Sequence, residues 1–324
     1  MQRWNSLEDV PAGFGPSVVT LGNFDGMHRG HQHLVKTVVR RARAQGAAAV
    51  AITFHPHPRV VHRPEERLAL IQSLPDRLAA LAALGLDAAL VAPYTREFSQ
   101  LSPEQFARQY LVGPLGAVEV VGGRDLHFGA DHSGDLATMR ALGQRLGFAV
   151  TVIDDQADPD EAAAGRWSST SARQSLDQGD VANAARVLGR PHRVTGEVVH
   201  GEGRGRSLGF PTANLGGRVA GLIPADGVYA GYIARPSLPA GAPDQVLPAA
   251  ISVGVNPTFA GRERRVEAHA LGRDDLDLYG EPVAVDFVER LRHTLPFANT
   301  AALVTQMRDD AAAAARVLLQ RPPA

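Results

Sequence analysis

The sequence contains no cysteine, and lysine occurs only once, at Lys36. Without cysteine the chain cannot form disulfides, thiolate nucleophiles or cysteine-based zinc sites. The net charge is −1, so no global field favours a nucleic acid or an anionic membrane as a partner. No apolar run approaches the length of a membrane span, and the N-terminus lacks the apolar core of a signal peptide. We therefore expect a cytoplasmic protein without nucleic-acid or membrane partners; the sequence leaves the oligomeric state open, and an oligomer is compatible with it.

At 324 residues the chain is long enough for two domains. Its first part alternates apolar strand-like runs with helical patterns. Strands are expected at 18–21, 48–54, 88–92, 117–122 and 148–153, and helices near 31–45, 75–84, 103–111 and 134–146. This alternation is typical of an α/β fold with a parallel sheet covered on both faces, in which ligands bind at the carboxyl ends of the strands.

The second part of the chain has a different rhythm. An acidic, Ala- and Gly-rich stretch at 155–166 and a helical segment at about 169–188 come first. Short runs without intervening helices then follow at 194–200, 228–233, 247–253, 265–270 and 282–288. Short strands separated by turns suggest an antiparallel barrel, and an amphipathic helix at roughly 299–319 closes the chain. We expect two domains, at 1–186 and 187–324.

The most informative stretch is LGNFDGMHRGHQHLV at 21–35, between an apolar strand and an apolar helix. A sharp turn from strand to helix points the free N–H groups of the helix at the contents of the turn, and this attracts phosphate. Gly22 and Gly26 permit backbone angles that other residues resist. Because His28 and His31 are three residues apart at the helix start, both rings can reach one face.

Three other interpretations apply to this stretch. The sequence GHQHLVKT at 30–37 is not a P-loop, because Val35 replaces the second glycine and lies with Lys36 inside the helix. A zinc site would use the histidine pair, although the spacing is shorter than the usual i, i+4 pair and no catalytic glutamate follows it. A purely structural role for the histidines stays open as well.

Together with three further motifs, GNFDGMHRGH resembles the nucleotidyltransferase signature of the bacterial bifunctional riboflavin kinase/FAD synthetase family. The further motifs are TFHPHP at 53–58, GRDLHFG at 123–129 followed by Gly134 and Asp135, and SSTSAR at 168–173. The resemblance implies a Rossmann-like sheet and transfer of an adenylyl group from ATP to FMN, with His28 and His31 stabilising the α-phosphate. It also implies that ATP is bound by Gly22, Asn23, Phe24, Asp25, Gly30, Ser169, Thr170 and Arg173, and FMN by Phe54, Pro58, Asp125 and Phe128.

The implied chemistry suits these residue types. The FMN phosphate is already anionic at neutral pH, so its attack on ATP needs no general base, and catalysis reduces to positioning and charge stabilisation. For Phe54 and Phe128 a plain core position is the alternative. The chain departs from the family where Leu126-His127 replaces Phe-Arg and where Ser171-Ala172 replaces Arg-Ile. The loss of two cations would weaken adenylylation or move their duty to other arginines, such as Arg124.

The second domain carries GEGRGRSLGFPTAN at 201–214, a glycine-rich basic loop suited to phosphates. The hydroxyl of Thr212 and the amide oxygen of Asn214 are hard, neutral ligands that suit Mg²⁺ bound to ATP. A capped turn after a hairpin would explain the same residues without a ligand. Further along the chain stand GVNPTF at 254–259, VEAHAL at 266–271, DLYG at 277–280 and LRHTLPF at 291–297.

This series closely resembles the riboflavin kinase module of the same family, whose fold is a six-stranded barrel. The resemblance implies Mg-ATP binding by Gly203, Gly205, Pro211, Thr212 and Asn214, with Thr212 and Asn214 at the metal. It implies that Glu267 is the catalytic base, and a base is needed because the attacking hydroxyl of riboflavin must lose a proton. Arg292 matches an arginine expected near riboflavin, whereas Thr294 stands where the family usually has an acidic residue.

The two resemblances cover nearly the whole chain and imply a bifunctional enzyme. It would phosphorylate riboflavin to FMN and adenylylate FMN to FAD, with ATP and Mg²⁺ used in both steps. Three alternatives remain: a riboflavin kinase with a degenerate nucleotide-binding domain, a flavin sensor without activity, and a different nucleotidyltransferase such as a cytidylyltransferase. The kinase module disfavours the last, because its product is the substrate of the first module.

Overall fold

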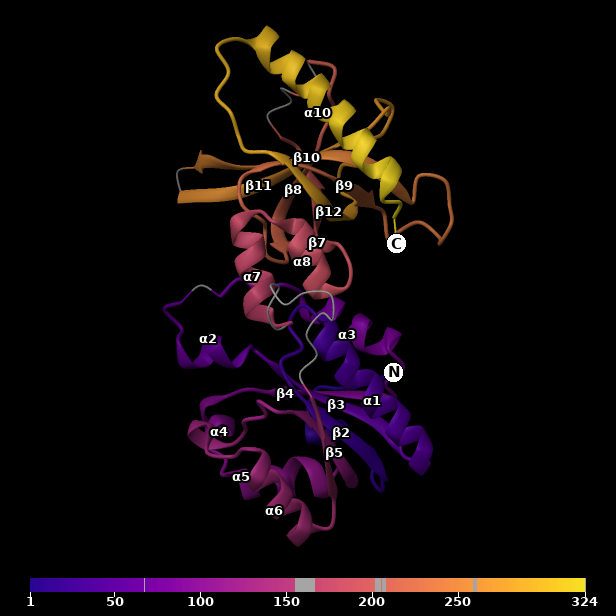
Figure 1. The fold of residues 1–324 in the computed structure, drawn as a ribbon, viewed down its shortest axis with the longest axis vertical. Coiled ribbons are helices and arrows are strands. Elements are labelled where there is room, and N and C mark those ends of the chain that lie inside the picture. Colours follow the sequence, from indigo (N-terminus) through magenta and orange to yellow (C-terminus); the bar gives the residue numbers. More distant parts are fainter. Residues whose placement is uncertain (67, 155–166, 202–204, 206–207, 259–260, 324) are drawn as a thin grey trace. The chain divides into compact units, whose positions relative to one another are not determined.

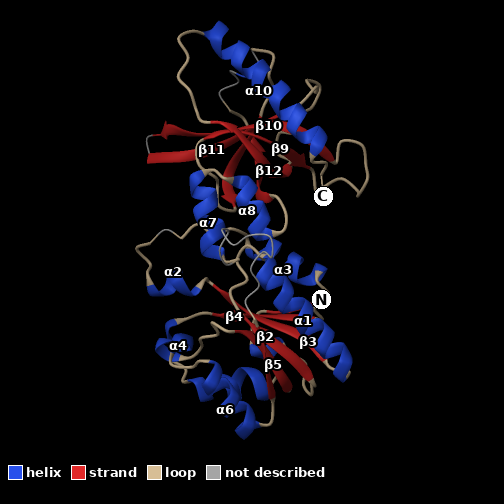
Figure 2. Ribbon diagram, viewed as in Figure 1, coloured by secondary structure: helices blue, strands red, loops and turns tan. Residues whose placement is uncertain are grey.

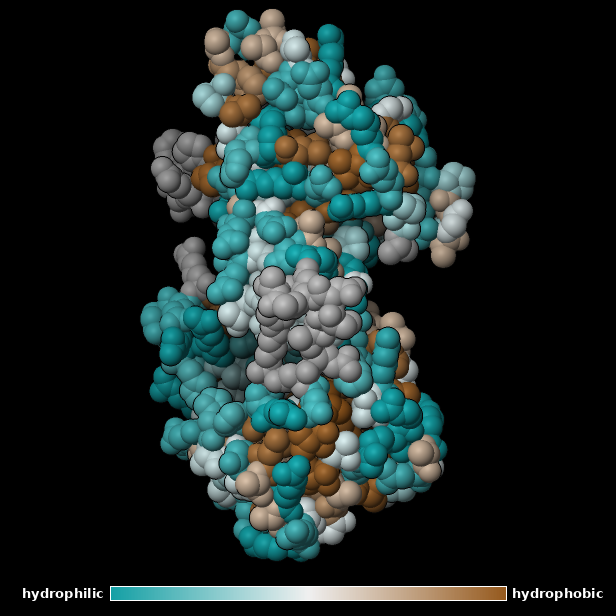
Figure 3. All heavy atoms as spheres, viewed as in Figure 1, coloured by the Kyte–Doolittle hydropathy of each residue, from teal (hydrophilic) through white to brown (hydrophobic). Residues whose placement is uncertain are grey.

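The structure is a computed structural model that describes residues 1–66, 68–154, 167–201, 205, 208–258 and 261–323. The side chains of residues 218, 256–258 and 261–263 are likewise outside the description. The chain divides into two compact units (Figure 1). Residues 1–69 and 73–167 form the first unit, and residues 70–72 and 168–324 form the second. Polar side chains predominate on the visible face of each unit, with apolar patches between them (Figure 3).

The first unit is built on a six-stranded parallel sheet with the strand order β1-β4-β3-β2-β5-β6 (Figure 2). The strands are β1 Gln2–Trp4, β2 Ser17–Leu21, β3 Ala48–His55, β4 Ala88–Pro93, β5 Ala117–Gly123 and β6 Ala149–Ile153. The predicted parallel sheet is therefore confirmed. Strand β1 was not predicted, because three residues at the sheet edge are too few to show a pattern.

Alternating side chains of the central strands enter two separate cores. Val18 and Ala49 lie in one core, while their neighbours Val19 and Val50 lie in the other. Because successive strand residues point to opposite faces, both faces of this sheet are covered, and the strands are apolar throughout for this reason.

The helices of the first unit fill the connections between its strands. They are α1 Arg29–Gln45, α2 Pro58–His62, α3 Leu74–Ala83, α4 Arg96–Ser99, α5 Pro103–Phe106 and α6 Leu136–Leu146, with short turns η1 Leu7–Asp9 and η3 Ala130–His132. The helix expected at 103–111 consists of α5 followed by a π-helical turn, η2 Ala107–Val112. In the described part of the chain, none of the helices combines the length and apolar character that a membrane crossing requires.

The second unit is a closed six-stranded antiparallel barrel with the order β10-β11-β8-β7-β12-β9. Its strands are β7 His192–Val199, β8 Ala213–Ala220, β9 Gly227–Ala234, β10 Val246–Thr258, β11 Gly261–Ala270 and β12 Pro282–Arg292, and helix α10 Thr300–Gln320 follows. The predicted barrel and terminal helix are confirmed. Strand β8 was not predicted, because the Gly216-Gly217 pair conceals its alternation.

The helical segment expected at 169–188 is two helices, α7 Ser169–Gln178 and α8 Val181–Leu188. Gly179 ends α7 in the left-handed conformation, with a φ of 77°, and the Asp180 side chain then caps α8 by accepting from the Asn183 N–H. The Gly179-Asp180 pair thus ends one helix and begins the next.

Helices α7 and α8 belong to the barrel unit, so the contacts divide the chain before α7 rather than after α8. The Arg290 guanidinium on β12 donates to the Gln178 carbonyl at the end of α7, at 2.9 Å. The Ala225 N–H donates to the Leu176 carbonyl, also at 2.9 Å. The predicted domain boundary at 186 stays a prediction.

These contacts lead to a test with two fragments. We expect a fragment of residues 168–324 to be more stable than one of residues 187–324, because the shorter one lacks α7 and most of α8. Loss of the buried Leu176 and Val181 side chains alone should cost about 3 kcal/mol or more of unfolding free energy. Urea unfolding of both fragments measures the difference. Equal stabilities would show that the barrel does not need these helices and would favour a boundary at 186.

Candidate functional site

The turn between β2 and α1 has an unusual backbone. Phe24 and Met27 both have positive φ angles, 50° and 44°, although neither is a glycine. Both side chains are buried in the core beside α1. Non-glycine residues in this conformation are strained and persist only where the surrounding packing holds them. The ring of Phe24 folds back onto Gly22, where an added Cβ would lie 3.3 Å from it. The core therefore fixes the shape of this turn.

His28 and His31 lie together at the start of α1. His28 is the N-cap residue, and its Nδ1 accepts a hydrogen bond from the His31 backbone N–H at 3.4 Å. The two rings stack with their centroids 3.7 Å apart. Because Nδ1 of His28 acts as an acceptor, the neutral ring carries its proton on Nε2, which is a hydrogen-bond donor. Gly30 is required beside it, since a Cβ there would come within 3.2 Å of the His28 ring.

The electrostatic surroundings keep His31 neutral. Burial, followed by the neighbouring His28 and the Arg77 guanidinium, holds the pKa of His31 well below its ordinary value of 6.5. Its Nδ1 atom is buried and has no hydrogen-bond partner. His31 therefore adds a neutral imidazole, not a second positive charge, beside His28.

The other predicted residues of the turn lie below the histidines. The Asp25 side chain is buried, and the carbonyl oxygen of Asn23 accepts a hydrogen bond from the Thr53 hydroxyl at 3.4 Å. Arg77 on α3 is also buried here and donates to the same hydroxyl at 3.3 Å. The sequence did not single out Arg77. The available signal was its position on the apolar face of a helix, between Leu74 and Leu78.

The residues predicted to bind FMN are spread along the carboxyl ends of β3 and β5. Phe54 is half-buried and packs edge-on against Tyr94, with the ring centroids 5.7 Å apart. Pro58 begins α2, and Asp125 is exposed. Phe128 is buried in the core beside Phe106, which is the plain core position weighed for it above.

Leu126 and His127, which depart from the family pattern, have different surroundings in the structure. Leu126 is buried, and an added Cβ on Gly122 would lie 3.1 Å from its side chain, so Leu126 fills the core. His127 is exposed and its Nδ1 contacts the Asp125 carbonyl at 2.9 Å. Arg124 forms an ion pair with Asp154 at 2.6 Å.

Ser169, Thr170 and Arg173 lie on the first turns of α7, in the second unit. The side chain of Ser168 caps this helix by accepting from the Ser171 N–H at 3.1 Å. The turn with the histidine pair belongs to the first unit. The use of both sets of residues on one ATP molecule stays a prediction.

In the second unit, strand register brings the predicted base next to a predicted metal ligand. Glu267 on β11 lies directly opposite Asn214 on β8. Their neighbours Ala268 and Ala213 are also paired and are buried inside the barrel. Because side chains alternate along a strand, Glu267 and Asn214 both point to the outside, where opposite residues have Cβ atoms about 5 Å apart.

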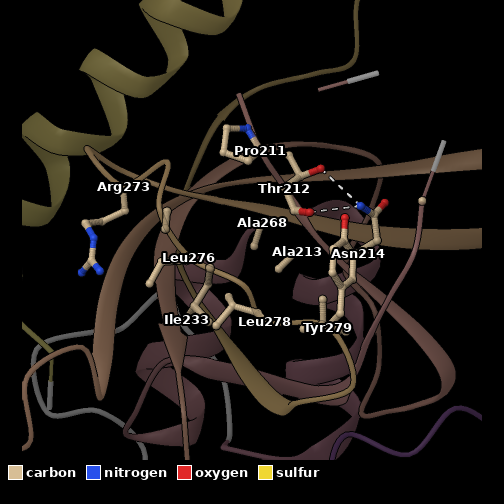
Figure 4. A pocket seen from close by; sticks show the side chains of 13 residues that line it. Pro211, Thr212, Ala213, Asn214, Ile233, Ala268, Arg273, Leu276, Leu278 and Tyr279 are labelled. Atoms are coloured by element: carbon tan, nitrogen blue, oxygen red, sulfur yellow. Dashed lines mark hydrogen bonds between the residues drawn. The ribbon is translucent and has the colours of Figure 1, made fainter. Parts of the chain in front are cut away.

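The Thr212–Asn214 segment is held in one conformation. The amide nitrogen of Asn214 donates to the Thr212 hydroxyl at 3.2 Å and to the Thr212 carbonyl at 3.3 Å (Figure 4). Gly201 lies against this amide, because a Cβ there would come within 2.8 Å of it. In this arrangement the Asn214 amide oxygen points away from Thr212. His269 supports the segment through a contact of its Nδ1 with the Pro211 carbonyl at 2.9 Å.

A cavity that is open to solvent adjoins this segment (Figure 4). Apolar side chains form most of its wall, and Thr212, Asn214 and Arg273 add polar groups. Tyr279 lines it as well and stacks on His200, with the ring centroids 3.8 Å apart. Apolar walls with a few polar groups at one end are typical of small-molecule sites.

The remaining residues predicted for the kinase site are Arg292, Gly205 and Gly203. The Arg292 guanidinium forms a double hydrogen bond with the buried Asp310 of α10, at 2.8 and 2.6 Å, and does not line the cavity. Gly205 lies against the Phe210 carbonyl, where a Cβ would come within 2.5 Å. Gly203 lies outside the described residues.

Comparisons with known proteins match both units. A family model described as FAD synthetase matches residues 12–170, and one described as riboflavin kinase matches residues 188–318. A protein from Escherichia coli strain K12 named bifunctional riboflavin kinase/FMN adenylyltransferase is 32% identical over 293 residues, 90% of each chain. A protein of the same name from Pseudomonas fluorescens is 35% identical over 315 residues, 97% of each chain. A crystal structure titled macrolide-efflux protein, from Streptococcus pneumoniae, superimposes with a TM-score of 0.84 at 30% identity and covers 97% of this chain and 98% of its own.

The lowered pKa of His31 can be tested directly. We expect its ring to stay neutral when the pH falls from about 7.5 to about 6, whereas the ring in the unfolded chain takes up its proton near 6.5. Because the unfolded state then binds more protons, this residue should make folding less stable as the pH falls through 6.5. Heteronuclear NMR of the imidazole, assigned with a His31→Ala variant, measures the titration. A midpoint at or above 6.5 would contradict the buried, neutral ring.

Proposed function

The chain belongs to the bifunctional riboflavin kinase/FMN adenylyltransferase family, and we propose that it carries out its two reactions in two separate sites, one for each family model that it matches. It phosphorylates riboflavin to FMN with ATP and adenylylates FMN to FAD with a second ATP. Because ATP is the co-substrate of both steps, we propose the cytoplasm as their location. The match of both family models in one chain supports this function over a riboflavin kinase alone.

In the proposed adenylyl transfer, an oxygen of the FMN phosphate attacks the α-phosphorus of ATP and pyrophosphate leaves. Negative charge gathers on the α-phosphate as the new bond forms, and preorganised donors stabilise it. The donors at the turn would be the His28 Nε2–H and the free backbone N–H groups at the start of α1. No residue has to remove a proton, which agrees with the neutral His31 imidazole. The observation that supports this site most is the histidine pair fixed by its own cap hydrogen bond.

Replacement of the histidines tests the adenylyl-transfer site. In His28→Ala and His31→Ala, we expect FMN adenylylation to fall by at least about 10²-fold, because a donor to the developing charge is lost. Riboflavin phosphorylation by the same preparations should be unchanged. The matched control is His33→Ala, which removes a histidine from the same helix but outside the turn and should leave both rates unchanged. Wild-type rates of FAD formation in either turn variant would show that the phosphate site is elsewhere.

In the proposed kinase step, the Glu267 carboxylate accepts the proton of the riboflavin hydroxyl as that oxygen attacks the γ-phosphorus of ATP. The bond from the γ-phosphorus to the β-phosphate oxygen breaks, and ADP leaves. The Thr212 hydroxyl and Asn214 amide oxygen would hold Mg²⁺ together with ATP, since both are hard oxygen donors on side chains that lie next to each other; the Asn214 amide would have to turn its oxygen toward the ion. When bound, the ion neutralises phosphate charge. Glu267 lies opposite Asn214 in the sheet, so base and metal ligand share one face of the barrel.

The nucleoside part of ATP would occupy the apolar cavity next to this segment. Its side-chain lining includes Leu276, Leu278 and Ile233, which suit the faces of an aromatic base. Thr212 and Asn214 at its edge then lie where the phosphates leave the cavity (Figure 4). Riboflavin contact by Arg292 is proposed from the resemblance alone, because its guanidinium here is paired with Asp310.

A conservative change isolates the base. Glu267→Gln keeps the size of the side chain but cannot accept a proton at neutral pH, so riboflavin phosphorylation should fall by about 10²–10⁴-fold. Adenylylation of added FMN should persist, since it needs no base. The matched control is Glu289→Gln, a glutamate on β12 that pairs with Arg321 and should be neutral for both rates. Normal phosphorylation in Glu267→Gln would reject the assignment of the base.

A further inference from the structure

Arg77 is an unexpected residue in the interior of the first unit. Its side chain is 1% exposed and is the largest of those that are fully buried. It lies on the buried face of α3 together with Leu78 and Leu81. Leucine or methionine at this position would pack without the cost of removing a charge from water. Stability alone therefore does not explain an arginine here.

Arg77 is connected by hydrogen bonds to the turn between β2 and α1. Its Nη1 donates to the Thr53 hydroxyl at 3.3 Å, and that hydroxyl donates to the Asn23 carbonyl at 3.4 Å. A single hydroxyl thus connects the guanidinium to the backbone of the turn. Burial lowers the pKa of Arg77 and the Asp25 carboxylate opposes this shift, so the two charges lie close enough to interact. Asp25 is itself 1% exposed.

Three polar atoms of this cluster are buried without a hydrogen-bond partner: Arg77 Nε, Asn23 Oδ1 and His31 Nδ1. Buried polar atoms normally have partners, and each exception costs stability. Three buried polar atoms without a hydrogen-bond partner, on Arg77, Asn23 and His31, indicate that this group of side chains is arranged for something other than stability.

We propose that Arg77 is a positioning residue of the adenylyl-transfer site. Its guanidinium holds the Asn23 peptide through Thr53 and faces the Asp25 carboxylate, so that the turn keeps the shape that receives the phosphates of ATP. The inference rests on the adenylyl-transfer function proposed above. It adds a residue that lies outside the four nucleotidyltransferase motifs, on a helix between them.

The test compares Arg77→Met with Arg77→Lys in the full-length chain. Methionine fills similar space without charge, and we expect kcat for FMN adenylylation to fall about 10²-fold with a smaller change in KM for ATP. Lysine keeps a charge and a donor and should recover part of the loss. Riboflavin phosphorylation should match the wild type in both variants. Both tryptophans of the chain, Trp4 and Trp167, lie in the first unit, so their fluorescence reports whether this unit stays folded.

A second variant keeps the test decisive if Arg77→Met unfolds the first unit. Thr53→Val has nearly the same shape but cannot connect Arg77 to Asn23, and its adenylylation kcat should fall about 10-fold with unchanged tryptophan fluorescence. Wild-type adenylylation in a folded Arg77→Met or Thr53→Val variant, or no recovery with lysine, would overturn the proposal. If the wild-type protein itself made no FAD from FMN, the proposed function would fail instead.

Discussion

The proposed adenylyl-transfer site depends on one hydrogen bond, from the His31 backbone N–H to Nδ1 of His28. This bond caps α1 and at the same time determines which nitrogen of His28 carries its proton. Just before this N-cap, Phe24 and Met27 have strained backbone angles and are held by the core. The packing of Phe24 and Met27 in the core thus helps to fix the turn from which His28 and His31 extend.

The proposed sites of the two units differ in the charge of their side chains, as the two proposed reactions require. At the turn the buried His31 has a lowered pKa and stays neutral, and the nearby cation, Arg77, is also buried. This arrangement suits a nucleophile that is already anionic, because no proton has to move. On the barrel a carboxylate, Glu267, lies opposite the amide of Asn214, which suits a hydroxyl nucleophile that must lose its proton. Each proposed site thus contains groups that suit the reaction proposed for it.

The strength of the local pattern decided which features could be predicted from the sequence. The central strands were predicted because both faces of the sheet are covered, which makes residues such as Val18 and Val19 apolar in succession. Strand β8 was missed because its glycines hide the alternation. The turn was found from its glycines and histidines. The role of Arg77 and the pairing of Arg292 with Asp310 were not accessible, because both depend on residues far apart in the sequence.

The central claim is that one chain holds two sites that work independently, and a mixing experiment tests it most directly. His28→Ala and Glu267→Gln are purified separately and incubated with riboflavin, ATP and Mg²⁺, alone and mixed, and the flavins are separated by chromatography. We expect His28→Ala alone to convert riboflavin only to FMN, and Glu267→Gln alone to leave riboflavin unchanged. The mixture should accumulate FAD, because FMN released by one protein is adenylylated by the other. A mixture that makes FMN but no FAD would contradict the central claim, since the two reactions would then require both intact sites in the same chain.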